Sequence, residues 1–164
     1  MDELARPAQL GDLPALGRLL EAAGRELAGR RGARLFVSGA GAGPPARGAG
    51  ADVDELLAAW MAEPPRCVLA GTLDDVVVGL ASGHVEPPVR GVGPIGVVDC
   101  CYVEEAARQV GVGGALRTAL QAWFDRQGCD GVDVPVLPGD RASKQLWEAA
   151  GFSARLLVLH RPPG

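Results

Sequence analysis

A glycine-rich turn between a strand-like run and a helix-like run constrains this chain more than any other feature. The turn lies within Val103–Leu116 and contains the pattern Arg108-x-x-Gly111-x-Gly113. The residues before it, Ile95–Val103, are β-branched and apolar enough for a mostly buried strand. A helix that begins directly after such a turn leaves several backbone N–H groups without intrahelical partners, which predicts an anion site. The helix is indicated by apolar residues at helical spacing before Gly128: Val112, Ala115, Leu116, Ala119, Leu120, Trp123 and Phe124.

The same turn has a purely structural alternative, in which its glycines only cap and pack, because short motifs often match by chance. Gly91-Val-Gly93-Pro-Ile-Gly96 illustrates such a match, since it satisfies the dinucleotide fingerprint G-x-G-x-x-G. A proline interrupts that run, and a strand follows it where the fingerprint needs a helix N-terminus. The Arg108 turn also lacks the Lys-Ser or Lys-Thr of a nucleotide-binding P-loop. Neither nucleotide motif therefore explains the turn.

Two ordered motifs resemble one family. Arg108-x-x-Gly111-x-Gly113 resembles the Q/R-x-x-G-x-G/A signature of the GCN5-related N-acetyltransferase (GNAT) family, whose loop cradles the pyrophosphate of acetyl-CoA. Downstream, the run from Asp140 to Phe152 resembles the second signature of that family, N-x-x-A-x-x-x-Y-x-x-x-G-F. The resemblance implies an N-acetyltransferase that uses acetyl-CoA as co-substrate and acts on a primary amine.

The order of the expected elements also fits that family over nearly the whole chain. A β-rich meander followed by a β-α-β unit predicts an α/β (α+β) fold with a mixed, mostly antiparallel sheet flanked by helices. By resemblance, the strand before the motif turn and the strand after the motif helix splay apart and hold CoA in the gap. The expected strands are Leu4–Ala8, Cys67–Leu73, Val76–Val85, Ile95–Val103, Val132–Leu137 and Ser153–His160.

Three further features complete the expected organisation. Asp12 is a good N-cap for a first amphipathic helix, and Asp52 or Asp54 for a second helix that ends before Pro64-Pro65. Another helix is expected over Arg141–Ala150, closed by Gly151. We expect one domain over residues 1–164, with a flexible Gly/Ala/Pro-rich loop at 39–50 that is either a plain loop or a lid over the acceptor site.

Composition restricts the classes of binding partner and the expected cellular compartment. The net charge of −4 argues against a general nucleic-acid or membrane-surface binder. No N-terminal signal sequence and no apolar run near ~20 residues is visible, so we expect a cytoplasmic protein. The four cysteines show no C-x-x-C spacing and are expected to be free thiols, and no metal is expected: Cys67, Cys100, Cys101 and Cys129.

The resemblance assigns the co-substrate site residue by residue. Backbone N–H groups of about Gln109 to Gly114 are expected to bind phosphate, and the N–H of Val103 is expected to face the thioester oxygen. The residues expected to contact acetyl-CoA are Cys101, Tyr102, Val103, Arg108, Gln109, Val110, Gly111, Val112, Gly113, Gly114, Asp140, Ser143 and Trp147.

The acceptor amine needs a proton acceptor, because a lysine-like amine has a pKa near about 10.4 and is mostly charged at neutral pH. Asp99 is the first candidate for the base, on the same face of its strand as Val103 if no bulge intervenes. Glu104 is the second. The alternative for Asp99 is a structural carboxylate satisfied by neighbouring donors.

The second motif departs from the family at two positions. Trp147 stands where the pattern usually has a tyrosine that protonates the departing thiolate, and an indole N–H cannot act as an acid near neutral pH. Asp140 replaces the usual asparagine. These departures leave three alternatives: a slower enzyme, an acid supplied by another residue such as Tyr102, or a non-catalytic acyl-CoA-binding or regulatory module on the same fold.

The C-terminus suggests a partner. The sequence ends soon after the expected strand Ser153–His160, where members of the family usually carry one more strand. An unpaired apolar edge strand is normally covered or paired in soluble proteins. We therefore expect a homodimer, or else a cover supplied by another part of the same chain.

Overall fold

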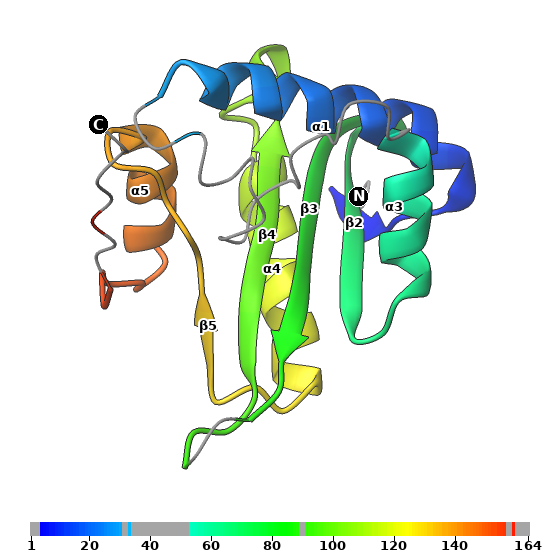
Figure 1. Cartoon of the computed structure of the whole chain (residues 1–164). Helices are drawn as coiled ribbons and strands as arrows, with labels where there is room; N and C mark the ends of the chain where they lie inside the picture. The colour runs from blue at the N-terminus through cyan, green and yellow to red at the C-terminus, as the bar shows by residue number, and fades with distance from the viewer. Residues whose placement is uncertain (1–3, 31–32, 34–52, 89–90, 157–158, 160–164) are drawn as a thin grey trace, which may run out of the picture.

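The computed structural model describes residues 4–30, 33, 53–88, 91–156 and 159, and Figure 1 gives the element labels. The strands are β1 (Ala5–Pro7), β2 (Arg66–Leu73), β3 (Val76–Glu86), β4 (Ile95–Val103) and β5 (Gly131–Asp133). The helices are α1 (Leu13–Ala28), α3 (Val53–Ala62), α4 (Val112–Arg126) and α5 (Arg141–Glu148).

One mixed sheet of order β1-β2-β3-β4-β5 organises these elements. The first four strands pair antiparallel, and β5 pairs parallel with β4 after the crossover through α4. The β2–β3 hairpin turns at Asp74 and Asp75, which adopt positive φ angles of 49° and 62°. Asp tolerates this left-handed conformation better than most residues, so the short polar turn predicted from the sequence is confirmed.

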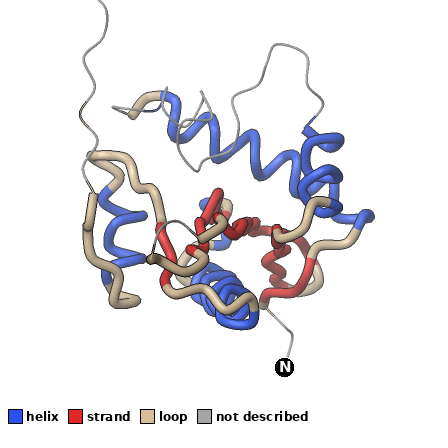
Figure 2. Tube along the Cα trace, turned by 60° about the horizontal axis from the view of Figure 1, so that its bottom comes forward, coloured by secondary structure: helices blue, strands red, loops and turns tan. Residues whose placement is uncertain are grey.

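Helices cover both faces of the sheet (Figure 2). α1 and α3 pack on one face, here called the front face, around a core that includes Leu16, Leu57 and Leu80. α4 packs on the opposite, back face through its fully buried side chains, among them Phe124. No helix in the described part of the chain is both long and apolar enough to span a membrane.

The predicted caps of the two front helices are found only in part, and Asp12 is the residue at the N-cap of α1. α1 begins at Leu13 as expected, but the carboxylate of Asp12 makes no cap bond to α1. It accepts instead from the backbone N–H of Gln9 (2.8 Å) and from both terminal nitrogens of Arg6 (2.7 and 2.9 Å). The Arg6 hydrogen bond is the main reason that the pKa of Asp12 is lowered. In α3, Asp54 lies inside the first turn of the helix, and Asp52, the other expected cap, lies outside the described residues.

The C-terminal part of the sheet is shorter than predicted. β5 covers only Gly131–Asp133, and Val134–Leu137 continues as an extended segment without strand pairing. The prediction of a strand over Ser153–His160 is wrong for its described residues, 153–156 and 159, none of which is in a strand. Arg155 instead attaches this segment to β5 through two hydrogen bonds to Asp133, of 2.8 and 2.5 Å. The expected loop at 39–50 lies outside the described residues.

Candidate active site

A cleft opens where β4 and β5 part. The two strands are in register only from Ile95 opposite Gly131 to Val97 opposite Asp133. Beyond that point Val98–Val103 on one side and Val134–Leu137 on the other line a cleft of about 520 Å³. The predicted splay is therefore present. It also explains why β5 is short, since a segment that leaves its neighbour loses its ladder partner.

The glycine turn lies at one end of this cleft. Gly111, at φ +100°, is the residue before the first turn of α4, and Gln109 also adopts a positive φ of 69°. The first helical hydrogen bond runs from the N–H of Ala115 to the carbonyl of Gly111 (3.0 Å). The N–H groups of residues 112–114 therefore have no partner one turn earlier, and the helix dipole adds positive potential there. Gly113 and Gly114 line the cleft directly.

The Arg108 side chain turns back toward the protein rather than toward the turn. Its Nε donates to the carbonyl of Val103 (2.9 Å), and its Nη2 donates to Glu26 of α1 (2.6 Å). The guanidinium also lies over the ring of Tyr102, 5.4 Å from its centroid. The hydrogen bond that Arg108 donates to the Glu26 carboxylate raises the pKa of Arg108. These contacts anchor the turn to β4 and α1.

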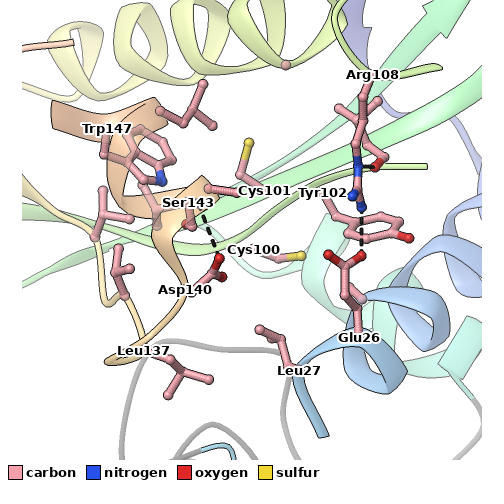
Figure 3. A pocket seen from close by; sticks show the side chains of 18 of the residues that line it. Glu26, Leu27, Cys100, Cys101, Tyr102, Arg108, Leu137, Asp140, Ser143 and Trp147 are labelled. Atoms are coloured by element: carbon pink, nitrogen blue, oxygen red, sulfur yellow. Dashed lines mark hydrogen bonds and ion pairs between the residues drawn. The ribbon is translucent and has the colours of Figure 1, made fainter. Parts of the chain in front are cut away.

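The second motif forms the opposite wall of the cleft (Figure 3). Asp140 caps α5 by accepting from the backbone N–H of Ser143 (3.3 Å), and it lies 3.5 Å from Arg30. Trp147 is 5% exposed and packs edge-on against Phe152, with ring centroids 5.1 Å apart. Burial of the indole in the back core explains how α5 is held beside the sheet.

Backbone groups of β4 point into the cleft. The N–H of Glu104 donates to the carbonyl of Val78 on β3 (3.0 Å). Because N–H directions alternate along an antiparallel strand, the N–H groups of Val103 and Cys101 point away from β3, toward the gap left by β5. The carbonyl of Val103 points the same way, where Arg108 reaches it.

The adjacent cysteines point to opposite faces, as predicted from strand alternation. Cys100 packs in the front core and Cys101 against the back core, and all four cysteines are free. Burial raises the pKa of Cys101 to about 12 and raises that of Cys100 further. Neither thiol is therefore poised as a nucleophile.

A bulge in β4 changes the position of Asp99. Ser82 of β3 lies opposite Cys100, whereas the next residue, Gly83, lies opposite Val98, so Asp99 is the extra residue. Val103 packs against the back core, but the carboxylate of Asp99 lies on the front side, hydrogen bonded to Arg66 and His84. The condition attached to the prediction, a strand without a bulge, is thus not met.

The other expected site residues divide into two groups. Tyr102 lines the cleft, on the opposite side from Trp147 in Figure 3. Glu104 does not line it, and its carboxylate pairs with Arg18 (2.7 Å). The side chains of Val110 and Val112 are also outside the lining, the first exposed and the second buried in the core.

Sequence reasoning missed several residues of the cleft. Glu26 and Leu27 come from α1, whereas Val134–Leu137 belongs to the segment expected by resemblance to form the other side of the gap. Only the closed fold brings the end of α1 to the cleft, so no local pattern marks these two residues. The three carboxylates among the described lining residues each pair with an arginine: Glu26 with Arg108, Asp99 with Arg66, and Asp140 with Arg30. Among the residues that can be described, no group of His, Cys, Asp or Glu is arranged to hold a metal ion.

The cleft thus combines a splayed sheet with a glycine turn at a helix N-terminus, where free backbone N–H groups can bind an anion. The model of the acetyltransferase (GNAT) family matches residues 41–152, and the chain belongs to that family. It is therefore an acetyltransferase by class. No curated protein sequence matches the chain.

Solved structures share the fold at low identity. A putative acetyltransferase from Agrobacterium tumefaciens is 19% identical, with a TM-score of 0.69 over 97% of this chain and 99% of that one. An aminoglycoside 6'-N-acetyltransferase from Acinetobacter haemolyticus is 15% identical, with a TM-score of 0.71 over 100% and 99%. A third, an aminoglycoside acetyltransferase in complex with the bisubstrate analogue CoA-S-monomethyl-acetylneamine, is 17% identical, with a TM-score of 0.69 over 98% and 97%. At these identities the likeness concerns the fold.

Proposed function

We propose that this protein transfers the acetyl group of acetyl-CoA directly to a primary amine while both substrates are bound. The observation that carries the proposal is the cleft between β4 and β5, with the N-terminus of α4 at one end. A site of this shape fits a ligand that has anionic phosphates at one end and a narrow, amide-containing arm. Direct attack needs no covalent enzyme intermediate, which agrees with the raised pKa values of Cys100 and Cys101.

The glycine turn would hold the pyrophosphate. Positive φ at Gly111 turns the backbone, and a Cβ built at Gly114 would meet nothing within 4 Å, so the space above the helix is open. Glycines let phosphate oxygens approach the N–H groups closely. Arg108 would act by bracing this turn, since its guanidinium is already bound to Glu26 and Val103.

The backbone of β4 would hold the arm and polarise the thioester. Val103 and Cys101 both direct N–H groups into the cleft, two residues apart, so one can bind a pantetheine amide while the other faces the thioester oxygen. A preorganised N–H donor at a developing oxyanion contributes about 2.7–4 kcal/mol of transition-state stabilisation. This role uses no side-chain chemistry, so it places no demand on residue type at either position.

Departure of the thiolate would proceed without help from Trp147. Its indole cannot supply a proton, and its side chain is packed against Phe152. A thiol with a pKa of about 8.5 is a tolerable leaving group. Tyr102 is the remaining candidate for an acid, because it carries a hydroxyl and lines the cleft.

Acetyl-CoA is expected to raise the melting temperature of the protein. A ligand present at 100 times its Kd stabilises the folded state by about 2.7 kcal/mol, which corresponds to about 5–10 °C for a chain of this length. Gly113→Val should abolish this shift by blocking phosphate approach. The fold can accommodate a side chain at Gly113, since a Cβ there would contact only Val103 Cγ2, at 3.7 Å. Differential scanning fluorimetry measures the shift.

Gly24→Val is the matched control for that experiment. Gly24 is also a helical glycine, in α1, and a Cβ there meets nothing within 4 Å. The control should keep the full shift. A folded Gly113→Val protein with the full shift would refute the site. Stabilisation by acetyl-CoA without CoA release on any amine would instead favour a binding module.

A homodimer is part of the same proposal. Leu156 and Leu159 follow α5 and are 82% and 85% exposed. Pairing with a second copy would cover these side chains. We expect sedimentation at micromolar concentration to give twice the chain mass of 16.9 kDa. A mass equal to that of one chain, unchanged by acetyl-CoA, would contradict the dimer.

A further inference from the structure

A buried polar cluster lies on the front face of the sheet, directly beside the cleft. Arg66 of β2 and His84 of β3 are register partners, so their side chains share one face. The bulge in β4 turns Asp99 toward them. Its Oδ2 lies 2.5 Å from Arg66 Nη1, and its Oδ1 lies 2.8 Å from His84 Nδ1. Asp99 itself lines the cleft.

The hydrogen bond between His84 and Asp99 fixes the chemistry of the imidazole. A carboxylate can only accept, so Nδ1 must carry the hydrogen. In the neutral ring the other nitrogen, Nε2, then holds a free lone pair and can accept a proton. The His84 side chain is 28% exposed, whereas that of Asp99 is 6% exposed. The imidazole is therefore the more exposed group of the pair, and the carboxylate beside it is nearly buried.

Asp99 is poorly placed to take the proton itself, because its side chain is only 6% exposed and its charge is paired with Arg66. Arg66 compensates its charge, and Arg66 is held in turn under Trp60, 5.0 Å from the ring centroid, and near Glu63, at 3.9 Å. Among the described residues, Arg66 is thus the charged group in contact with the His84–Asp99 pair, and Trp60 and Glu63 act on the pair only through Arg66. The arrangement orients the imidazole, as a carboxylate orients histidine in other catalytic dyads and triads.

The direction from which the amine can approach also favours the front face of the sheet. The back of the sheet is filled by α4, whose side chains Leu116, Leu120 and Phe124 are at most 1% exposed. An amine that attacks a thioester held along β4 must therefore arrive from the front side or from the mouth of the cleft. Asp99 lines the cleft on that front side, and His84 is hydrogen bonded to it from just outside the cleft lining, so a proton can pass from the amine to His84 directly or through one water. The backbone N–H of Cys101, two residues from Asp99, faces the gap.

We infer that His84 is the catalytic base of the transfer and that Asp99 is the residue that positions it; this inference rests on the proposed function. The amine attacks in its neutral form. As its nitrogen bonds to the carbonyl carbon and the carbon–sulfur bond breaks, the nitrogen loses a proton to His84 Nε2. The sulfur leaves as CoA thiolate and takes a proton from water, and the imidazolium returns its proton to solvent.

His84→Gln tests the inference. Glutamine can still donate an N–H to Asp99 but cannot carry the proton near neutral pH. His160→Gln, at the other histidine of the chain, is the matched control. CoA release is followed with neamine, spermidine, a lysine-containing peptide and a peptide with a free N-terminus, and the best acceptor is used for pH profiles of kcat.

We expect His84→Gln to lower kcat by about 10²- to 10⁴-fold and to remove the fall in kcat on the acid side of neutrality. The KM for acetyl-CoA and the melting shift it produces should stay unchanged, and His160→Gln should behave as the natural chain. An unchanged kcat and pH profile in His84→Gln would overturn the inference while leaving the proposed function intact. Absence of CoA release by the natural chain with all four amines would overturn both.

Discussion

Substitution of Phe124 by alanine is expected to lower the free energy of unfolding by about 3–5 kcal/mol. The Phe124 ring is 1% exposed and occupies a depression in the sheet made by two glycines. A Cβ at Gly96 would lie 2.4 Å from the ring, and one at Gly83 would lie 2.6 Å from it. Alanine would leave that depression empty, and the glycines cannot fill it. Urea denaturation measures the change.

Thr118→Ala on the same helix is the control, because Thr118 is exposed. A surface change of this kind is expected to stay within about 0.5 kcal/mol. A loss for Phe124→Ala no larger than that of the control would contradict the packing of α4 described above. Since α4 presents its N-terminus to the cleft, the destabilised variant should also bind acetyl-CoA more weakly near its melting temperature.

Substitution of Arg66 by alanine is expected to lower the free energy of unfolding by about 3–5 kcal/mol at neutral pH. The reason is that the buried carboxylate of Asp99 would lose its cationic partner. The side chains of this pair are only 16% and 6% exposed. The double variant Arg66→Met with Asp99→Leu should regain most of this unfolding free energy, because it removes both charges and fills their space with apolar side chains. Thermal and urea unfolding of the three proteins give the comparison.

The pair between Arg18 and Glu104 supplies a control with the same chemistry on the surface. Its atoms are 2.7 Å apart, but the side chains are 54% and 29% exposed. Exposed pairs contribute about 0–1 kcal/mol, so Arg18→Ala should have a small effect. Equal costs for the two arginine variants would mean that burial does not govern the stability of the Asp99 cluster. Together with His84→Gln, these variants separate the structural part of the cluster from its proposed part in proton transfer.

The sequence was sufficient for most of the fold, because the patterns involved are local. Both ends of strand β4 and the first residue of α4 agree with the prediction. The signals involved, an apolar β-branched run and a glycine turn, act over only a few residues. The two motifs, at Arg108 and at Asp140, predicted the family that the comparison then identified. The predicted length of strand β5 was too great, because an apolar run does not show whether a neighbouring strand remains within hydrogen-bond distance.

The geometry of the site was decided by the tertiary structure. One bulged residue reverses the direction of Asp99, and no residue type in β4 announces it. Its partners lie 33 and 15 positions away in the sequence, at Arg66 and His84. Arg108 likewise finds Glu26 across 82 positions. The sequence by itself determined which segments form strands, helices and the glycine turn, whereas only packing of distant segments determined which charges meet, because burial and contact between them exist only once the sheet is assembled.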